Sequence, residues 1–379
     1  MKGSAGPPAG PPAPPYDPVE LAAAILACLP DMSPLRLHAL LERGGGPVGA
    51  LAALDRGIAA AVLCSDAPER ELPARQTLAR TWQEGATLDR ITRVLVERHP
   101  HVFVAGRAGY PIDELPDRPA VLLAEGARPD ALHAPRVAVV GTRGATPQGL
   151  DDARDLGRVL AEAGVTVISG LAIGIDAAAH EGALSVGGAV IGVVATGLDV
   201  VYPRRHRALF ERVRSAGLLM SEVGYGVQPR RYAFPIRNRI IAALAQVVVV
   251  VEATLKGGAR ITAERAVEYG RTVMAYPGSR RNPAAAGTNA LLYDGAGVVL
   301  EPSDVLVALE LERPAPRPDL RTAPVGEARA VLHACHGEPA TLDQLASRAG
   351  LAPAAVVAAV RALERGGWME RARGLCWPR

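Results

Sequence analysis

Near-continuous runs of β-branched residues recur from residue 136 onward, and they constrain the fold more than any other feature. Segments of amphipathic helical periodicity separate these runs, which are Val137–Val140, Val165–Ile168, Val190–Val194, Val247–Val251, Val273–Ala275 and Val298–Leu300. A strand that is apolar on both faces must be covered on both faces, and strands that alternate with helices form parallel sheets. The pattern predicts an α/β domain over residues 134–311, with a doubly wound, Rossmann-like parallel sheet.

Composition divides the rest of the chain into five further segments. Residues 1–18 form a proline-rich tail, which we expect to be disordered, and residues 19–66 show short helical patterns typical of a small helical domain. Residues 67–133 are a mixed connector, and residues 312–324 are a proline-rich linker. Residues 325–379 complete the chain and predict a separate small domain.

This C-terminal segment carries the signals of three helices and a hairpin. Thr341 and Gln344 predict a capping box for the second helix, and Gly350 predicts its end. The element order is typical of a winged-helix domain. Its third helix, however, is mostly alanine and valine, whereas base reading needs polar side chains. We therefore expect phosphate contacts through Arg371, Arg373 and Arg379, or a protein–protein role.

Several classes of protein are disfavoured by the sequence. The longest apolar runs of the 379 residues are too short to span a membrane, and no secretory signal is visible. The four cysteines show neither a disulfide framework nor zinc-ligand spacing. We expect a cytoplasmic protein without a membrane partner, metal or cofactor. The net charge of +3 does not by itself indicate nucleic acid, although all but two of the 42 basic residues are arginine.

Glycine recurs where the predicted strands end, which is where ligands bind in doubly wound sheets. The residues concerned are Gly141, Thr142 and Arg143, then Ser169, Gly170 and Gly174, then Lys256, Gly257 and Gly258, and finally Pro277, Gly278 and Ser279. Glycine allows close backbone approach and leaves N–H groups free for phosphate. One such turn could simply be tight, but several on one sheet edge favour a phosphate site. The dinucleotide and P-loop fingerprints are absent, which argues against a nicotinamide enzyme or an ATPase.

The stretch Gln228–Ile241 interleaves arginines with Tyr232 and Phe234, without any acidic residue. Cations with interleaved aromatic rings suit single-stranded nucleic acid, because they meet the backbone and the unstacked bases. A helix start with a solvated basic face and a core phenylalanine is almost equally compatible with this stretch. The nearby basic segment Tyr202–Arg207 favours binding.

A catalytic triad is a weaker interpretation of Ser169, Asp176 and His180. The nucleophile-elbow pattern is missing, so we expect Asp176 to lie at a helix start and His180 to be bonded locally.

The motifs taken together resemble the DNA-processing protein family DprA/Smf. The resemblance rests on an ordered set over the α/β segment: Val139–Arg143, Ser169–His180, Tyr202-Pro203, Ser221-Glu222, Phe234–Arg239, Val250–Ala253, Thr262-Ala263 and Pro277–Ser279. The N-terminal helices more weakly resemble the family's SAM-like or helix-hairpin-helix domain, and many members have a winged helix.

The resemblance implies a non-catalytic protein of natural transformation. Such proteins bind and protect incoming single-stranded DNA, load the recombinase RecA on it against the block by single-strand-binding protein, and form homodimers. It implies that Arg143 contacts a phosphate and that Phe234 stacks on a base. Pro235, Arg237, Asn238 and Arg239 would belong to the pocket, and Gly170, Gly174, Gly257 and Gly258 would admit the strand.

The chain departs from the family at Ile173, where a lysine or arginine is usual. We expect weaker binding or a substitute cation, for which Lys256 and Arg260 are candidates.

Two other functions remain open. A nucleotide-binding, phosphoribohydrolase-like enzyme of related fold would need a P-G-G-x-G-T-x-x-E loop, but Lys256–Arg260 departs from it. A transcription regulator would need a better base-reading helix.

Overall fold

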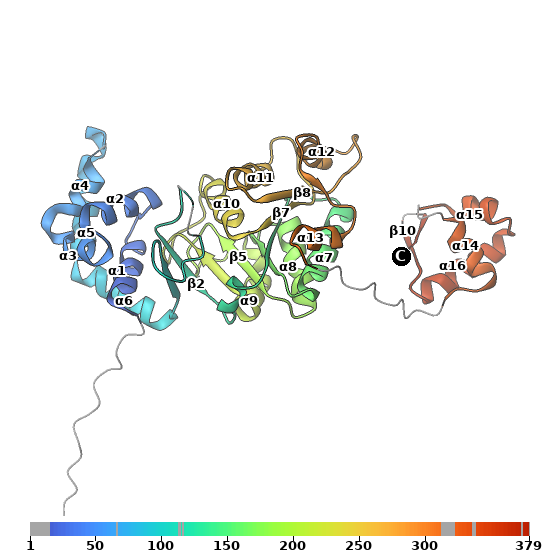
Figure 1. The fold of residues 1–379 in the computed structure, drawn as a ribbon, viewed down its shortest axis with the longest axis horizontal. Helices are drawn as coiled ribbons and strands as arrows, with labels where there is room; N and C mark the ends of the chain where they lie inside the picture. Colours follow the sequence, from blue (N-terminus) through green and yellow to red (C-terminus); the bar gives the residue numbers. More distant parts are fainter. Residues whose placement is uncertain are drawn as a thin grey trace, which may run out of the picture. The chain divides into compact units, whose positions relative to one another are not determined.

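The protein is described by a computed structural model, which covers residues 16–65, 67–112, 115, 117–311, 323–335, 339–372 and 374–378 (Figure 1). The chain forms two compact units, Met1–Pro314 and Ala315–Arg379. The expected disordered tail up to residue 15 and the linker at 312–322 lie outside the described residues, as do Arg373 and Arg379.

A mixed nine-stranded sheet forms the centre of the first unit among the residues described. In spatial order its strands are β1 (His101–Val104), β2 (Val121–Glu125), β6 (Leu218–Ser221), β5 (Val190–Val194), β4 (Thr166–Ser169), β3 (Arg136–Val140), β7 (Val247–Val250), β8 (Thr272–Ala275) and β9 (Gly297–Val298). The strands from β6 to β9 are parallel, and β2 and β1 extend the sheet antiparallel to them. The predicted α/β class is confirmed.

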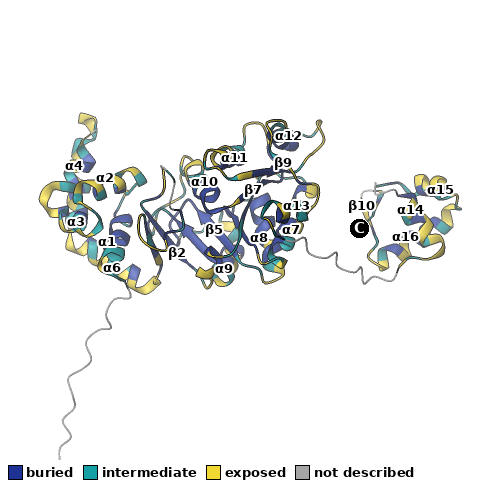
Figure 2. Ribbon diagram, viewed as in Figure 1, coloured by how far each residue is buried: buried dark blue, intermediate teal, exposed yellow. Residues whose placement is uncertain are grey.

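Helices cover both faces of the sheet, which explains the continuous apolar runs (Figure 2). Val137 and Val139 of β3 belong to one hydrophobic cluster, and Ala138 and Val140 belong to the other. The first cluster includes α7 (Pro147–Glu162), α8 (Ile175–Ser185), α9 (Arg207–Ala216) and α13 (Pro302–Ala308), and the second includes α10 (Ala233–Leu244), α11 (Gly258–Glu268) and α12 (Ala286–Tyr293).

Four strands differ from the sequence-based expectation. β6 was not expected, because Leu218, Leu219 and Met220 lack the β-branched character of the other runs. β1 and β2 come from the segment expected to be a connector, and they pair with the sheet through β6. The last strand, β9, is shorter than the run Val298–Leu300 suggests and is exposed.

The N-terminal helices share the first hydrophobic cluster with the sheet. They are α1 (Pro18–Ala27), α2 (Pro34–Gly44), α3 (Pro47–Ala52), α4 (Ala59–Cys64), α5 (Leu72–Gln83) and α6 (Gly85–Arg98). The end of α1 lies directly on the loop after β6, since a Cβ at Gly224 would be 2.6 Å from the Ala27 carbonyl oxygen. These helices therefore form a wall beside the sheet.

The second unit contains α14 (Gly326–Ala334), α15 (Leu342–Ala349), α16 (Pro353–Arg365) and the antiparallel pair β10 (Met369–Ala372) and β11 (Leu375–Pro378). The predicted capping box is present: Gln344 N–H donates to Thr341 Oγ1 (3.2 Å) and Thr341 N–H donates to Gln344 Oε1 (2.8 Å). Gly350 ends α15 at φ 64°. Within the described ranges no single helix could cross a membrane; the bent pair α15 and α16 passes that test by length and composition only.

Candidate nucleic-acid interface

The loops that follow the parallel strands meet at one edge of the sheet and bring together most of the expected site residues. Gly141–Arg143 follow β3, Gly170–Gly174 follow β4, and Lys256–Gly258 follow β7. The start of α10 reaches the same edge because that helix follows β6. This is the edge at which doubly wound sheets bind ligands.

An exposed cluster of three side chains, which we call the outer layer, lies at this edge. The Arg143 guanidinium carbon is 5.1 Å from the centroid of the Phe234 ring. The Tyr202 and Phe234 ring centroids are 5.3 Å apart, with an angle of 40° between the ring planes. Arg143 is exposed, Phe234 is half-buried and Tyr202 is 39% exposed. The outer layer thus presents a cation and two aromatic rings to solvent, the groups that a phosphate and an unstacked base require.

Further exposed cations lie in the segments after β5, β6 and β7, up to the first residue of α9: Arg204, Arg205, Arg207, Arg230, Arg231 and Lys256. Ile173, at which we expected the loss of a cation, is half-buried in the loop after β4. Arg260, the other candidate for a substitute, lies 3.7 Å from Glu264 in an ion pair. Lys256 is therefore the better placed of the two to meet a ligand.

Arg237 lies beneath the outer layer and serves the fold. Its residue is 5% exposed, and its Nη1 donates to the carbonyl oxygens of Gly170 (3.0 Å) and Val193. The carboxylate of Asp176, also buried, accepts from the N–H of Gly170 (3.1 Å) and Ala172 (3.4 Å). We call Gly170, Asp176 and Arg237 the inner layer. Arg237 lines a cleft at this edge, but its Nη1 and Nε already donate within the protein, and Nη1 joins the ends of β4 and β5.

Burial shifts the titration of both charged groups in the inner layer. It lowers the pKa of Arg237 to about 10, while the charge of Asp176 opposes this change. It also raises the pKa of Asp176, against the attraction of Arg237 and the hydrogen bonds from the two N–H groups. Opposite charges that are buried together favour one another's charged forms. The inner layer therefore functions as an internally compensated unit.

Asn238 and Arg239 are also engaged within the protein. Asn238 Nδ2 donates to the Gly258 carbonyl oxygen (3.1 Å), and its Oδ1 accepts from Arg237 Nε (3.2 Å). Arg239 Nη2 lies 2.5 Å from Glu222 Oε1, and both side chains are nearly buried. Burial raises the pKa of Glu222, and the neighbouring Arg239 opposes the rise. In the basic motif after Tyr232, the exposed residues are Pro235 and Ile236, and Phe234 is half-buried.

The glycines of this edge differ in why, and how strictly, the structure requires glycine at each position. A Cβ at Gly170 would lie 2.5 Å from both terminal nitrogens of Arg237, so only glycine leaves room for the guanidinium. Gly174 has φ +90°, and its Cβ would lie 2.3 Å from the Thr142 carbonyl oxygen. Gly257 and Gly258 are less restricted, since a Cβ at these positions would lie 3.1 Å and 3.8 Å from the nearest atom.

The remaining expected residues stabilise the loops. A Cβ at Gly141 would lie 2.4 Å from Ile175. Thr142 Oγ1 accepts from Gly144 N–H (3.2 Å), and the Thr142 backbone N–H donates to the Glu252 carbonyl oxygen (2.7 Å). Ser169, fully buried, donates from Oγ to the Val139 carbonyl oxygen (2.6 Å).

The triad interpretation finds no support in these positions. The His180 ring is fully buried and its Nε2 lies 3.3 Å from the Ile191 carbonyl oxygen. Burial lowers the pKa of His180 to about 4. Ser169 and Asp176 are both bonded to backbone groups. The expectation that Asp176 lies at a helix start is confirmed, and His180 contacts the backbone of β5 rather than its own helix.

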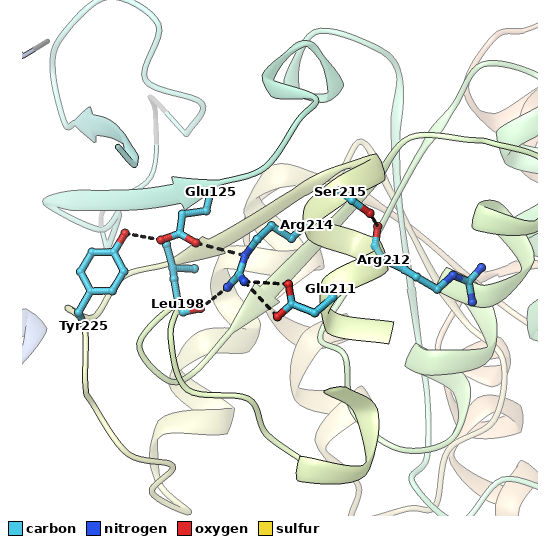
Figure 3. A network of polar contacts seen from close by, with 7 residues as sticks. All are labelled: Glu125, Leu198, Glu211, Arg212, Arg214, Ser215 and Tyr225. Atoms are coloured by element: carbon cyan, nitrogen blue, oxygen red, sulfur yellow. Dashed lines mark hydrogen bonds and ion pairs between the residues drawn. The ribbon is translucent and has the colours of Figure 1, made fainter. Parts of the chain in front are cut away.

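Sequence reasoning missed a polar network around the buried Glu125 that holds the loops after β5 and β6 (Figure 3). Tyr225 donates from its hydroxyl to Glu125 Oε1 (2.6 Å), and Arg214 Nε lies 3.2 Å from Glu125 Oε2. Arg214 also donates to the Leu198 carbonyl oxygen (2.7 Å). Burial and the bond to Glu125 raise the pKa of Tyr225. Because these residues are 89 to 100 positions apart, no local pattern could have paired Glu125 with them.

Comparisons with known proteins agree with this geometry. The family model described as DNA recombination-mediator protein A matches residues 101–310, from β1 to the end of α13. The protein Smf of Escherichia coli is 37% identical over 294 residues, which are 74% of this chain and 78% of the relative. The structure of DNA processing protein A from Streptococcus pneumoniae is similar, with a TM-score of 0.63 and 33% identity over 78% of this chain and 99% of that one.

A second solved structure is DNA processing protein A from Helicobacter pylori, described for its single-stranded DNA binding mode. It has a TM-score of 0.50 and 30% identity, over 56% of this chain and 97% of that one.

Proposed function

The chain belongs to the family of DNA recombination-mediator protein A, and from that premise we propose that it captures single-stranded DNA at the outer layer. The observation that carries the proposal is the exposed Arg143 guanidinium beside the Phe234 ring, with Tyr202 next to it. A phosphate would pair with Arg143, and a base would stack on the rings.

The other expected site residues take part in two ways in this proposal. Gly141, Thr142, Gly174, Gly257 and Gly258 shape the loops that meet the backbone of the strand, and Lys256 adds a second cation. Ser169, Gly170, Arg237, Asn238 and Arg239 hold the loops from beneath. We propose that the protein acts without catalysis, and this is supported by the structural hydrogen bonds of Ser169, Asp176, Arg237 and Asn238.

The proposed biological role is based on the family. We propose that the protein protects incoming single-stranded DNA in the cytoplasm during natural transformation and loads RecA on it, displacing single-strand-binding protein. We propose further that it forms a homodimer through the α/β domain at 134–311. The helices at 19–66 and the proposed winged helix at 325–379 precede and follow this domain in the sequence.

The test is fluorescence anisotropy of a labelled oligo-dT strand, measured with wild type and Arg143→Ala over a salt series. We expect tight, salt-dependent binding that resists duplex competitor. The variant should lose about 1.5–3 kcal/mol of binding free energy, typical of a charged hydrogen bond, and its salt slope should fall by about 0.7. Arg329→Ala, on α14 of the second unit, is the matched control. Absence of strand binding at low salt would overturn the proposal.

A further inference from the structure

A cleft of about 670 Å³ opens next to the outer layer, between the N-terminal helices and the sheet edge. One wall consists of the connection from α1 to α2 together with Arg90, Ile91 and Val94 of α6. The opposite wall consists of the ends of β5 and β6, the loop after β6 and the first half of α10. Its volume lies in the range of ligand sites in proteins.

The surfaces of this cleft suit a flat apolar group. Val194, Ala195, Ile236 and Ile240 line it. Tyr232, which is 62% exposed, lies at its rim only two residues before Phe234. One ring therefore belongs to the cleft and the other to the outer layer, and the short segment between them joins the two sites.

The charges of the cleft favour an anion at the rim. Its carboxylates are already engaged: Glu222 pairs with Arg239, Asp199 Oδ1 accepts from Gly226 N–H (2.8 Å), and Asp31 lies 3.4 Å from Arg230. Arg90 is exposed and forms no ion pair within the part of the chain that the structure describes. An apolar floor, an aromatic face and an unpaired cation together match a nucleobase with its phosphate.

The loop that forms part of this wall is held in place. Tyr225 lies in the loop after β6 and is tied through Glu125 to Arg214, which also holds the loop after β5 (Figure 3). A wall fixed in this way does not have to be ordered when a ligand enters, which reduces the entropic cost of binding.

We propose that this cleft is a second nucleotide subsite for the DNA strand bound at the outer layer. It would take one unstacked base, a neighbour of the base at Phe234, with Arg90 on its phosphate. The inference rests on the proposed function, because it supposes that a strand is bound at Arg143. A free mononucleotide would offer the same chemistry, and the experiments below separate the two sources.

The first experiment maps the strand by photo-crosslinking. A single 5-iododeoxyuridine is moved along an oligo-dT of about ten nucleotides, within the site sizes of single-strand binders. We expect adducts on Tyr232 at positions next to those that give adducts on Phe234 or Tyr202, and none on Tyr293, which is 93% exposed on α12. Adducts on Phe234 or Tyr202 at every reactive position, with none on Tyr232, would overturn the proposal.

The second experiment compares Arg90→Glu with Arg93→Glu, an exposed arginine one turn along α6 that does not line the cleft. Affinity is measured for oligo-dT strands of increasing length. Arg90→Glu should lower the affinity for long strands about tenfold, or about 1.4 kcal/mol, and should leave the affinity for the shortest bound strands unchanged. Arg93→Glu should change neither. Equal effects of the two variants at all lengths would overturn the proposal.

Two further outcomes have defined meanings. If Arg143→Ala weakens binding but Arg90→Glu does not, the second subsite is wrong and the proposed function stands. If wild type binds no strand, both fail. Titration of dTMP completes the set: dTMP that binds wild type but not Arg90→Glu, with strand affinity unaffected by the variant, would make a free nucleotide the ligand and overturn the strand proposal.

Discussion

The outer and inner layers of the sheet edge use the same chemical group in opposite surroundings. In the outer layer the Arg143 guanidinium lies exposed beside an aromatic ring, and in the inner layer the Arg237 guanidinium is buried among backbone carbonyl oxygens. The first can exchange water for a phosphate, whereas the second has already exchanged water for the protein. Residue type alone therefore does not distinguish a ligand-binding arginine from a structural one.

The largest expected effect comes from removing the buried guanidinium. Arg237→Ala leaves Asp176 without its compensating charge and the carbonyl oxygens of Gly170 and Val193 without a donor. We expect the free energy of unfolding to fall by about 3–5 kcal/mol, as measured by denaturant titration of the full chain. Arg231→Ala, an exposed neighbour, should stay within about 0.5 kcal/mol of wild type. A stable Arg237→Ala protein that fails to bind DNA would break the comparison.

A second prediction uses the pH dependence of the buried histidine in the same edge. The folded pKa of His180, about 4, lies below its ordinary value of 6.5, so the unfolded chain takes up the proton first. The neutral, buried ring makes its full contribution to the free energy of unfolding above pH 6.5. As the pH falls toward 4, this contribution of about 3 kcal/mol is lost.

His180→Gln should flatten this loss when unfolding is measured at several pH values. The raised pKa of Asp176 has the opposite slope, but both proteins retain that carboxylate. Parallel stability curves for the two proteins would contradict the assignment of the acid loss to His180.

The outer layer should respond in binding rather than in stability. Phe234→Leu removes the ring that lies between Arg143 and Tyr202. We expect strand affinity to fall by about 1–3 kcal/mol, as for loss of one stacked base. Phe103→Leu on β1 is the control, because it loses a ring away from this edge. Unfolding that changes as much as binding would place Phe234 with the inner layer.

The smallest effect separates charge from ring contact. Arg143→Lys retains the cation but loses the planar group beside Phe234. We expect a loss of about 0.5–1 kcal/mol in strand affinity at an unchanged salt slope. Equal affinities of arginine and lysine in anisotropy titrations would show that the contact with the ring contributes nothing.

Much of the sheet could be predicted because its strands are buried on both faces and read as valine-rich runs. β6 escaped prediction because packing between β5 and β2 makes it a strand, while its leucines and methionine are equally suited to a helix. β1 and β2 pair across a long loop, which leaves no periodic signal.

The candidate site could be predicted from the sequence only in part. Arg237 could have been assigned to the interior, since it is spaced three, four and seven residues from Ile240, Ile241 and Leu244, all buried on α10. The network of Glu125, Arg214 and Tyr225 could not be predicted, because its members meet only when the sheet is assembled.

The Arg237 guanidinium occupies the space that a side chain at Gly170 would need. The residue that is tolerated at one of these positions therefore depends on the residue at the other. Gly170→Ala alone must displace a buried charge, and Arg237→Ala alone leaves carbonyl oxygens unsatisfied. A mutational path that changes both must pass through a destabilised intermediate. In a selection for folded variants, glycine and arginine at these sites should therefore be kept or exchanged together, although 67 residues separate them.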